Sequence, residues 1–280
     1  MFPVLTTYTA LTTVAGLERG RTDARESEPV GPMDDPTVDA TLPHLNRHVR
    51  GLVELQRLTG RRPGEAMSIR RRDIDMSGEV WLYEPATHKT AWKGKERTIP
   101  IGPKVQTLLK GYFTDNPNDY LFSPARYEAE RLAERAVRRK TPRWPSHMKR
   151  NESKRIGADR KRPPRARYER QSYLTAIERA CDRAFPLPAE LAPCRKDGKI
   201  ESRAMWWERL TDAERARVKA WRREHRWSPY RLRHLFATKV RHAYDLEAAQ
   251  VLLGHARADV TEIYAQKNLT LAAKVATEIG

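Results

Sequence analysis

The chain has little cysteine and no long apolar run, and both features limit the classes of protein to which it can belong. Its 280 residues include two cysteines, Cys181 and Cys194, which form no CxxC pair, so neither a disulfide framework nor a structural zinc site is predicted. No apolar stretch approaches the roughly 18 residues that cross a bilayer. The apolar N-terminus has no basic start of the kind that secretory signals carry. We therefore expect a cytoplasmic protein that makes no use of a membrane.

Motifs for cofactor chemistry are also lacking. The sequence contains no GxxxxGK(S/T) phosphate loop, so nothing indicates nucleotide hydrolysis. No set of histidine, cysteine or carboxylate residues has the spacing of metal ligands, and metal-independent chemistry is expected. We predict no cofactor and no small-molecule substrate.

What the chain has in excess is positive charge. Its formal net charge is +18 at pH 7 and its isoelectric point is about 10.1. A strongly basic chain favours a polyanionic partner. Nucleic acid is the first candidate, and an acidic membrane surface is the second.

Apolar spacing and helix breakers predict a mainly α fold with a small antiparallel β-sheet. Residues 1–40 are expected to form a disordered or loosely packed lead, because 18–37 carry charge, proline and glycine without an apolar period. Residues 41–280, with organised structure from Leu42, are taken as one domain. Alternation predicts strands at 79–83 and 97–101. The 3.6-residue period predicts helices at 45–58, from 63, and at 105–113, 126–139, 172–184, 211–225 and 229–279, the last broken near Gly254 and after Tyr264.

A basic segment interrupts this pattern. Residues 138–170 hold fourteen lysines and arginines against three acidic residues, together with four prolines. This composition predicts a flexible basic insertion. One interpretation is a solvated loop. The other is an arm that contacts DNA phosphates and becomes ordered on DNA.

Two arginines stand in motifs suited to holding a phosphodiester. Arg62 lies in Gly-x-Arg-x-x-Glu, where Glu65 is expected to support the helix or the arginine. Arg233 lies in the run Tyr-Arg-Leu-Arg-His at 230–234. Attack on a phosphodiester adds negative charge to its non-bridging oxygens, which preplaced cations stabilise. An arginine fork bonds two oxygens and keeps its charge. Arg61 is the adjacent alternative to Arg62.

A histidine and a tyrosine follow towards the C-terminus. His255 occupies a Leu-Gly-His motif, and Tyr264 lies nine residues later. A phenol that attacks a phosphodiester keeps the energy of the bond in a covalent link, so a second strand can be joined without ATP. The order of two arginines, a histidine and a late tyrosine therefore suits nucleophilic attack by Tyr264.

These motifs resemble those of the tyrosine recombinase, or phage-type integrase, family over residues 40–270. The resemblance implies the catalytic-domain fold of that family, double-stranded DNA as the partner, and a homo-oligomer, a tetramer, on DNA. It implies that Arg62 and Arg233 clamp the scissile phosphate and that His255 donates a hydrogen bond to it. Tyr264 would be the nucleophile that forms a 3′-phosphotyrosyl link.

Two further roles follow from the resemblance. The family's general acid is a lysine on a turn between two strands, and Lys89 in His-Lys-Thr matches it, with Lys93 and Lys95 as alternatives. The second box of the family begins with histidine, but this chain has Tyr230 there. A phenol with a pKa near 10 exchanges protons at neutral pH less readily than an imidazole. His234, one helical turn later, is a candidate substitute.

Family members usually carry an N-terminal core-binding domain, and the sequence shows no counterpart before the first box. Two functions remain open. One is a site-specific DNA recombinase or integrase, of a phage or mobile element, with full or reduced activity. The other is a truncated, catalytically decayed DNA-binding remnant. A third hypothesis, an RNA- or membrane-associated basic protein, would require all the motif matches to be accidental.

The C-terminal segment carries one apolar stripe. Leu271, Val275 and Ile279 stand at i, i+4 and i+8, which places them on one face of a short helix. Packing on its own domain is one interpretation. Docking into a neighbouring protomer of a DNA-bound tetramer, as the family does, is the other.

Overall fold

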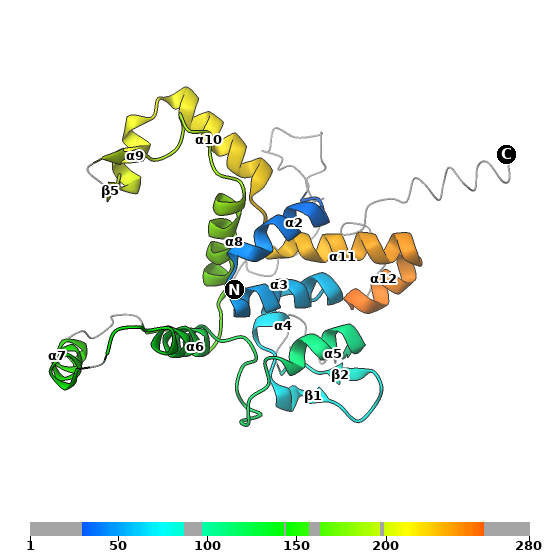
Figure 1. Cartoon of the computed structure of the whole chain (residues 1–280). Coiled ribbons are helices and arrows are strands. Elements are labelled where there is room, and N and C mark those ends of the chain that lie inside the picture. Colours follow the sequence, from blue (N-terminus) through cyan, green and yellow to red (C-terminus); the bar gives the residue numbers. More distant parts are fainter. Residues whose placement is uncertain (1–29, 87–96, 143, 157–162, 197–198, 255–280) are drawn as a thin grey trace, which may run out of the picture. The chain divides into compact units, whose positions relative to one another are not determined.

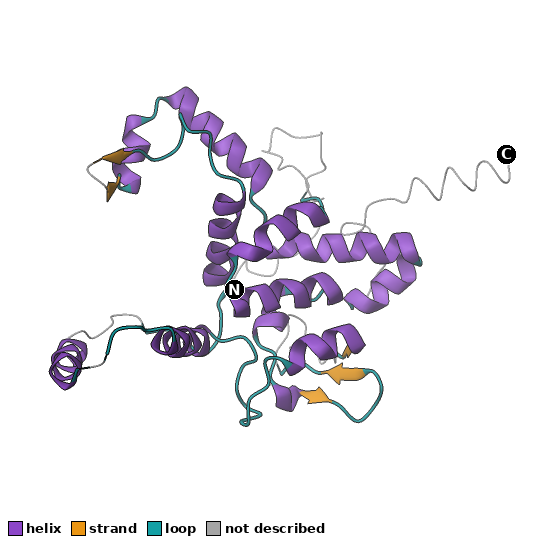
Figure 2. Ribbon diagram, in the orientation of Figure 1, coloured by secondary structure: helices purple, strands orange, loops and turns teal. Residues whose placement is uncertain are grey.

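A computed structural model describes residues 30–86, 97–142, 144–156, 163–196 and 199–254 of the chain. This part of the chain is mainly helical and holds a small antiparallel sheet, as the sequence predicts (Figures 1 and 2). None of its helices is long and apolar enough to cross a membrane.

The helix α3 (Arg47–Thr59) carries much of the main core. It begins where the Asn46 side chain accepts a hydrogen bond from Val49 N at 2.9 Å, and it ends at Gly60, which adopts a left-handed φ of 60°. A residue with a Cβ atom is strained in that conformation, which is why glycine suits the position. Five apolar residues of the helix are fully or almost fully buried, namely Val49, Gly51, Leu52, Val53 and Leu55.

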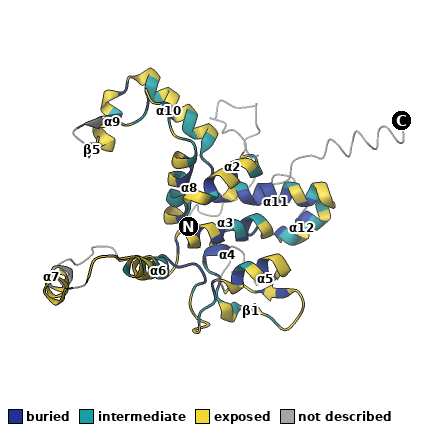
Figure 3. Ribbon diagram, viewed as in Figure 1, coloured by how far each residue is buried: buried dark blue, intermediate teal, exposed yellow. Residues whose placement is uncertain are grey.

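The helix α11 (Pro229–Ala243) packs against α3 and is followed by α12 (Leu246–Leu253). Figure 3 shows much of α11 in the dark blue of buried residues. The predicted helix over 229–279 is broken earlier than expected, because the Asp245 side chain accepts a hydrogen bond from Ala248 N at 2.6 Å and starts a new helix. The predicted break near Gly254 is confirmed, since that residue has a left-handed φ of 65°.

The sheet has the order β1-β2-β3, with β1 at Ile74–Asp75, β2 at Trp81–Tyr83 and β3 at Ile99–Ile101. Both pairings are antiparallel, and Tyr83 lies opposite Ile74 on one side and Ile99 on the other. Side chains alternate along β2, so that Trp81 and Tyr83 are buried and Leu82 is exposed. The two predicted strands are confirmed, and β1 is a third that the sequence pattern did not indicate.

Short helices frame the sheet. The helix α4 (Pro63–Met67) begins with proline at its first turn, as predicted. The helix α5 (Pro103–Lys110) follows β3. Two 3-10 turns, η1 (Leu42–His44) and η2 (Arg71–Asp73), complete this part of the chain.

The expected lead of residues 1–40 is too long at its C-terminal end. The helix α2 spans Asp35–Thr41, and within and before it Val38 and Met33 belong to the hydrophobic core. The sequence does carry the signal for this helix, because the Asp34 side chain accepts a hydrogen bond from Thr37 N and a proline lies in the first turn. Residues 1–29 lie outside the described part of the chain.

The expected basic insertion at 138–170 contains a helix. The helix α6 (Pro124–Val137) leads into it, and α7 (Pro145–Ile156) lies within it. The sequence pattern did not indicate the helix α7. Figure 3 shows α7 largely in the yellow of exposed residues and α6 in both yellow and the teal of intermediate residues. The end of the insertion belongs to the core, because Tyr168 is buried just before α8 (Arg170–Ala184).

Residues 185–227 have a small core of their own. They form a two-stranded ladder, β4 (Arg195–Lys196) with β5 (Lys199–Ile200), and the helices α9 (Arg203–Arg209) and α10 (Asp212–His225). The predicted helix over 211–225 is confirmed, whereas the sequence pattern indicated neither the ladder nor α9. Along α10 the residues at 213, 216 and 220 are exposed, and the buried residue is Val218. The core of this unit consists of Leu191, Trp206, Leu210 and Val218.

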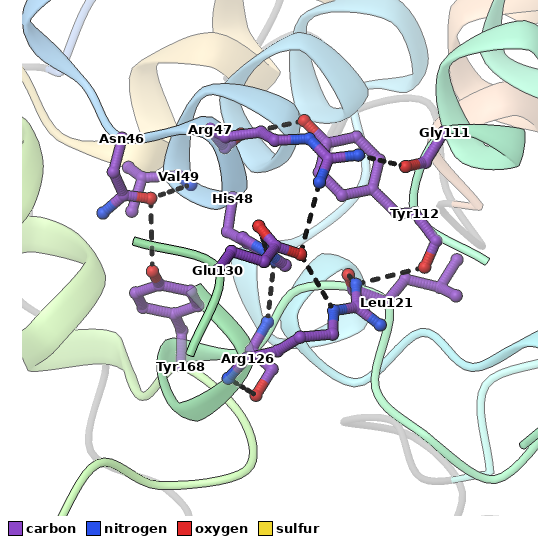
Figure 4. Close-up of polar contacts among 11 residues, drawn as sticks. Asn46, Arg47, His48, Val49, Gly111, Tyr112, Leu121, Arg126, Glu130 and Tyr168 are labelled. Carbon is purple, nitrogen blue, oxygen red and sulfur yellow. Dashed lines mark hydrogen bonds and ion pairs between the residues drawn. The ribbon is translucent and has the colours of Figure 1, made fainter. Parts of the chain in front are cut away.

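A buried histidine joins α3 to α6 (Figure 4). The His48 side chain is fully buried; its Nδ1 accepts a hydrogen bond from Ser123 N at 3.2 Å, and its Nε2 lies 3.1 Å from Glu130 Oε2. Because Nδ1 accepts, the proton of the neutral ring sits on Nε2 and is donated to Glu130. Burial lowers the pKa of His48, and this effect outweighs the opposing attraction of Glu130. The fold therefore holds the neutral ring.

This histidine predicts a loss of stability in mild acid. The unfolded chain takes up a proton as the pH falls through about 6.5, while the folded state resists it down to a lower pH. The free energy of unfolding should therefore fall over that window, with a slope of at most about 1.4 kcal/mol per pH unit for one group. Urea unfolding at several pH values should show that His48→Gln reduces this slope. The same change at the exposed His147 should leave the slope in place, and the reverse result would contradict the assignment.

Candidate active site

The first arginine of the predicted clamp stands at the start of α4. Arg62 donates its backbone N–H to Glu65 Oε2 at 3.0 Å, and its Nη1 donates to Glu65 Oε1 at 2.9 Å. The Arg62 side chain is 24% exposed, whereas Glu65 is buried. The spacing of three residues thus brings the pair together across one turn of the helix, and Glu65 supports the arginine as the sequence led us to expect.

A second arginine, Arg97, shares this carboxylate. Its Nε lies 3.6 Å from Glu65 Oε1, and the side chain is buried. Burial alone would raise the pKa of Glu65, but Arg97 and Arg62 together hold that pKa below its usual value. The carboxylate is therefore ionised at neutral pH. Sequence reasoning missed Arg97, because one arginine before a strand gives no signal in a chain with 54 lysines and arginines.

The alternative to Arg62 has no access to solvent. Arg61 is 0% exposed, and its guanidinium lies over the ring of Tyr83, 5.0 Å from the centroid. Its Nε donates to Thr59 Oγ1 at 3.0 Å, while Nη1 and Nη2 have no hydrogen-bond partner among the described residues. Burial lowers the pKa of Arg61 to about 10. Of the two neighbours, only Arg62 is partly exposed to solvent.

Arg233 joins three separate parts of the sequence. It is 1% exposed on α11, and its Nη1 donates to the carbonyl of Gly60 at 2.6 Å while its Nη2 donates to the carbonyl of Leu253 at 2.8 Å. Gly60 stands two residues before Arg62, and Leu253 stands two residues before His255. We number the three motifs as boxes: the first contains Arg62, the second contains Arg233, and the third is Leu-Gly-His at 253–255. One guanidinium therefore ties the three boxes together through the backbone.

The other two residues of the second box differ in exposure. Tyr230, in the first turn of α11, is 40% exposed, while His234 is buried at 7%. Both residues lie on α11 four positions apart, as expected, but their exposures differ. The phenol reaches solvent, and the imidazole packs into the protein.

The remaining predicted site residues lie outside the described part of the chain. They are Lys89 with its alternatives Lys93 and Lys95, His255 and Tyr264. Their convergence with Arg62 and Arg233 stays a prediction. Within the described ranges, no group of three or more histidine, cysteine, aspartate or glutamate residues is placed to hold a metal ion.

Comparison with known proteins places these features in a family. The model of the phage integrase family matches residues 37–184 and 191–270. This match covers most of the chain, and it includes all three boxes. The chain belongs to the phage integrase family. No curated protein sequence matches the chain.

Solved structures of a transposon integrase show the same fold, and a further recombinase is less similar. A Tn1549 transposon integrase in complex with circular intermediate DNA is similar with a TM-score of 0.54 and 13% identity, over 98% of this chain and 75% of that one. The same integrase in complex with transposon right end DNA gives 0.53 and 13%, over 98% and 76%. A XerH site-specific recombinase bound to difH substrate is 16% identical with a TM-score of 0.43, over 93% of this chain. The chain spans 57% of the length of that recombinase chain.

Proposed function

We propose that this protein is a site-specific DNA recombinase or integrase that cuts and rejoins DNA strands through a 3′-phosphotyrosyl intermediate. The observation that carries the proposal is the placement of Arg233. Its hydrogen bonds to the carbonyls of Gly60 and Leu253 bring the motif of Arg62 and the motif that continues to His255 to one guanidinium. Membership of the phage integrase family supports the same activity.

The two arginines of the site, Arg62 and Arg233, are held in place before the reaction begins. Arg62 is held by a buried carboxylate, and bonds to carbonyls do not cancel the charge of Arg233. Both guanidinium groups are therefore preorganised, which is the condition for stabilising the charge that develops on a phosphoryl oxygen. In the structure Arg233 is buried, whereas Arg62 is partly exposed.

The chemical step conserves the phosphodiester energy. The Tyr264 phenol gives up its proton to a neighbouring base or to water as its oxygen attacks phosphorus and forms a P–O bond, while the bond to the 5′-oxygen breaks. The 5′-oxygen takes a proton, for which Lys89 is the proposed donor, and His255 is proposed to bond the phosphate. A 5′-hydroxyl of a second strand then reverses the step and frees the tyrosine. No metal or nucleotide is required by this scheme.

A nicked suicide substrate tests the proposal. Duplexes are first enriched from a random-sequence pool by binding to the protein, and nicks are then placed at successive positions. When the strand is cut next to a nick, the short fragment diffuses away and the covalent protein–DNA adduct accumulates. An adduct on a denaturing gel supports the enzyme. DNA binding without any adduct, in the wild type and in Tyr230→His, would support the decayed DNA-binding remnant instead.

Tyr230→His should accelerate adduct formation. General acid–base assistance is worth roughly 10²–10⁴-fold, and a phenol that is 40% exposed retains part of the hydrogen bonding. We therefore expect a slow wild type, a gain of about 10-fold or more in the variant, and a new step in the pH–rate profile near the histidine pKa of about 6.5. Single-turnover cleavage measures both. A variant no faster than the wild type would show that the tyrosine is a competent substitute.

The exposed helices α6 and α7 are proposed to contact DNA phosphates. The basic side chains of this segment include Arg139 and Lys140, which follow α6, and Arg150 on α7, all exposed. Changing these three residues to glutamine should reduce the slope of log affinity against log salt by up to about 0.9 for each phosphate contact removed. Substitution is preferable to deletion, because Tyr168 at the end of the insertion is buried and donates to Asn46 Oδ1 at 3.3 Å.

A charge-matched control separates the arm from the net charge. Arg217, Lys219 and Arg223 on α10 offer the same loss of charge. Equal slopes for the wild type and the α6–α7 variant would support a solvated loop. An equal fall in both variants would point to general charge and away from the arm.

Partners and domain division complete the proposal. Double-stranded DNA is the proposed substrate, and strand exchange implies a homotetramer assembled on it. We also propose that the described residues belong to one catalytic domain, which begins with α2 and carries the α6–α7 segment as an insertion.

Truncation after Gln266 tests whether the C-terminal apolar stripe serves assembly. A loss of assembly on DNA that is larger than the loss of monomer stability would favour docking into a neighbouring protomer.

A further inference from the structure

Arg97 occupies a position between two motifs that the proposed mechanism uses. It is the first described residue after 87–96, and it stands two residues before the strand β3. The side chain is 8% exposed, its Nε lies 3.6 Å from Glu65 Oε1, and that same oxygen accepts from Arg62 Nη1 at 2.9 Å. The carboxylate therefore stands between two guanidinium groups, one buried and one partly exposed.

The same guanidinium also lies against the turn that ends α12. A Cβ atom added to Gly254 would overlap Arg97 Nη1 and lie 2.5 Å from Arg97 Cζ. Contact this close is possible because Gly254 lacks a side chain, and its left-handed φ of 65° also favours glycine. The carbonyl of the preceding Leu253 accepts a hydrogen bond from Arg233. Arg233 thus bonds one residue of this turn, and Arg97 lies against the next.

Within the described ranges, two of the buried nitrogen atoms of Arg97 lack a hydrogen-bond partner. Its Nε and Nη2 make no hydrogen bond among the described residues, although both atoms are buried. A buried donor without a partner is costly, so packing alone is a poor account of an arginine here. An apolar side chain would fill the space without that cost. The charge of Arg97 is what links it to Glu65.

We propose that Arg97 is a positioning residue of the site. Through Glu65 it fixes the guanidinium of Arg62, and through its contact with Gly254 it fixes the turn that leads into the third box. The inference rests on the proposed strand cleavage and deepens it. Arg97 does not touch the phosphate in this account; it sets the distance between the groups that do.

Four full-length variants test the role: Arg97→Gln, Arg97→Lys, Glu65→Gln and the double change of Arg97 and Glu65 to glutamine. Misplacement of a reacting group by about 1 Å can cost on the order of 10²-fold. Single-turnover adduct formation should therefore slow by about that factor in Arg97→Gln, while DNA affinity changes by no more than a few-fold. Arg97→Lys should recover part of the rate, because it keeps the charge beside Glu65.

The double variant shows whether the two residues act together. If Arg97 works through Glu65, the double variant should be no more than a few-fold slower than the slower single variant, since residues of one network are not additive. The matched control is Arg209→Gln, which removes an arginine that bonds Glu201 Oε1 at 2.9 Å in the unit around α9. Its rate should equal that of the wild type.

Amide hydrogen exchange gives a readout that needs no cleavage. Exchange over residues 60–67 and 250–254 should rise in Arg97→Gln and stay unchanged over α8. A rate equal to the wild type, or fully additive losses in the double variant, would overturn the inference while the recombinase proposal stands. If the wild type itself forms no adduct, the proposed function fails. Exchange then decides: unchanged exchange in both segments overturns the positioning role, and faster exchange confined to them supports it.

Discussion

Tyr264→Phe should abolish the covalent protein–DNA adduct while DNA affinity stays within a few-fold of the wild type. The substitution removes one oxygen atom, and that oxygen is the proposed nucleophile, so no 3′-phosphotyrosyl bond can form. Binding depends on many phosphate contacts and should hardly change. The measurement is adduct formation on the nicked substrate, with affinity measured in parallel at the same salt concentration.

A second tyrosine provides the control for this result. Tyr244, at the end of α11, is 75% exposed, and Tyr244→Phe should form the adduct at the wild-type rate. Any adduct formed by Tyr264→Phe would mean that another residue is the nucleophile. A large loss of affinity in Tyr264→Phe would mean that the residue acts in binding.

Loss of either clamp arginine should slow cleavage by on the order of 10²-fold or more, as for the removal of one preorganised charge stabiliser. The two variants should differ in stability. Arg62 is partly exposed, so Arg62→Ala should have a small effect on the free energy of unfolding. Arg233→Ala leaves the carbonyls of Gly60 and Leu253 without their donor in a buried place. Each such group costs about 1–3 kcal/mol.

Denaturant unfolding and single-turnover cleavage separate these effects. Arg233→Ala should lower both the rate and the stability, while Arg62→Ala should lower the rate alone. Arg50, which is exposed and pairs with Glu54 within α3, serves as the control, and Arg50→Ala should change neither quantity greatly. A rapid Arg62→Ala enzyme would remove Arg62 from the clamp and reopen the choice of the first cation.

Elements with strong local signals could be predicted from the sequence. The helix α3 has an asparagine cap, an apolar period and a terminal glycine, and each of these signals acts within a few residues. The helix α2 carries a similar cap, but a charged and proline-rich stretch around it hid the signal. The helix α7 has few apolar residues, so no period distinguishes it from a solvated loop.

In the candidate site, too, contacts that depend on local spacing could be predicted, and contacts between distant segments could not. The link between Arg62 and Glu65 follows from a spacing of three residues on a helix, which sequence alone reveals. The place of Arg97 depends on how β3 and α12 meet, and no local pattern encodes that meeting. The burial of Arg61 was equally hidden, because the two arginines are adjacent and chemically identical.

The bonds of Arg233 have a consequence for how this chain can diverge. Its partners are the main-chain oxygens of residues 60 and 253, and every amino acid supplies such an oxygen. A change of side chain at position 253 therefore leaves that bond intact, and no compensating change at 233 is needed. Searches for correlated substitutions would find little signal between these positions, even though they lie in contact. An insertion or deletion in either turn, by contrast, would move the carbonyl and break the link.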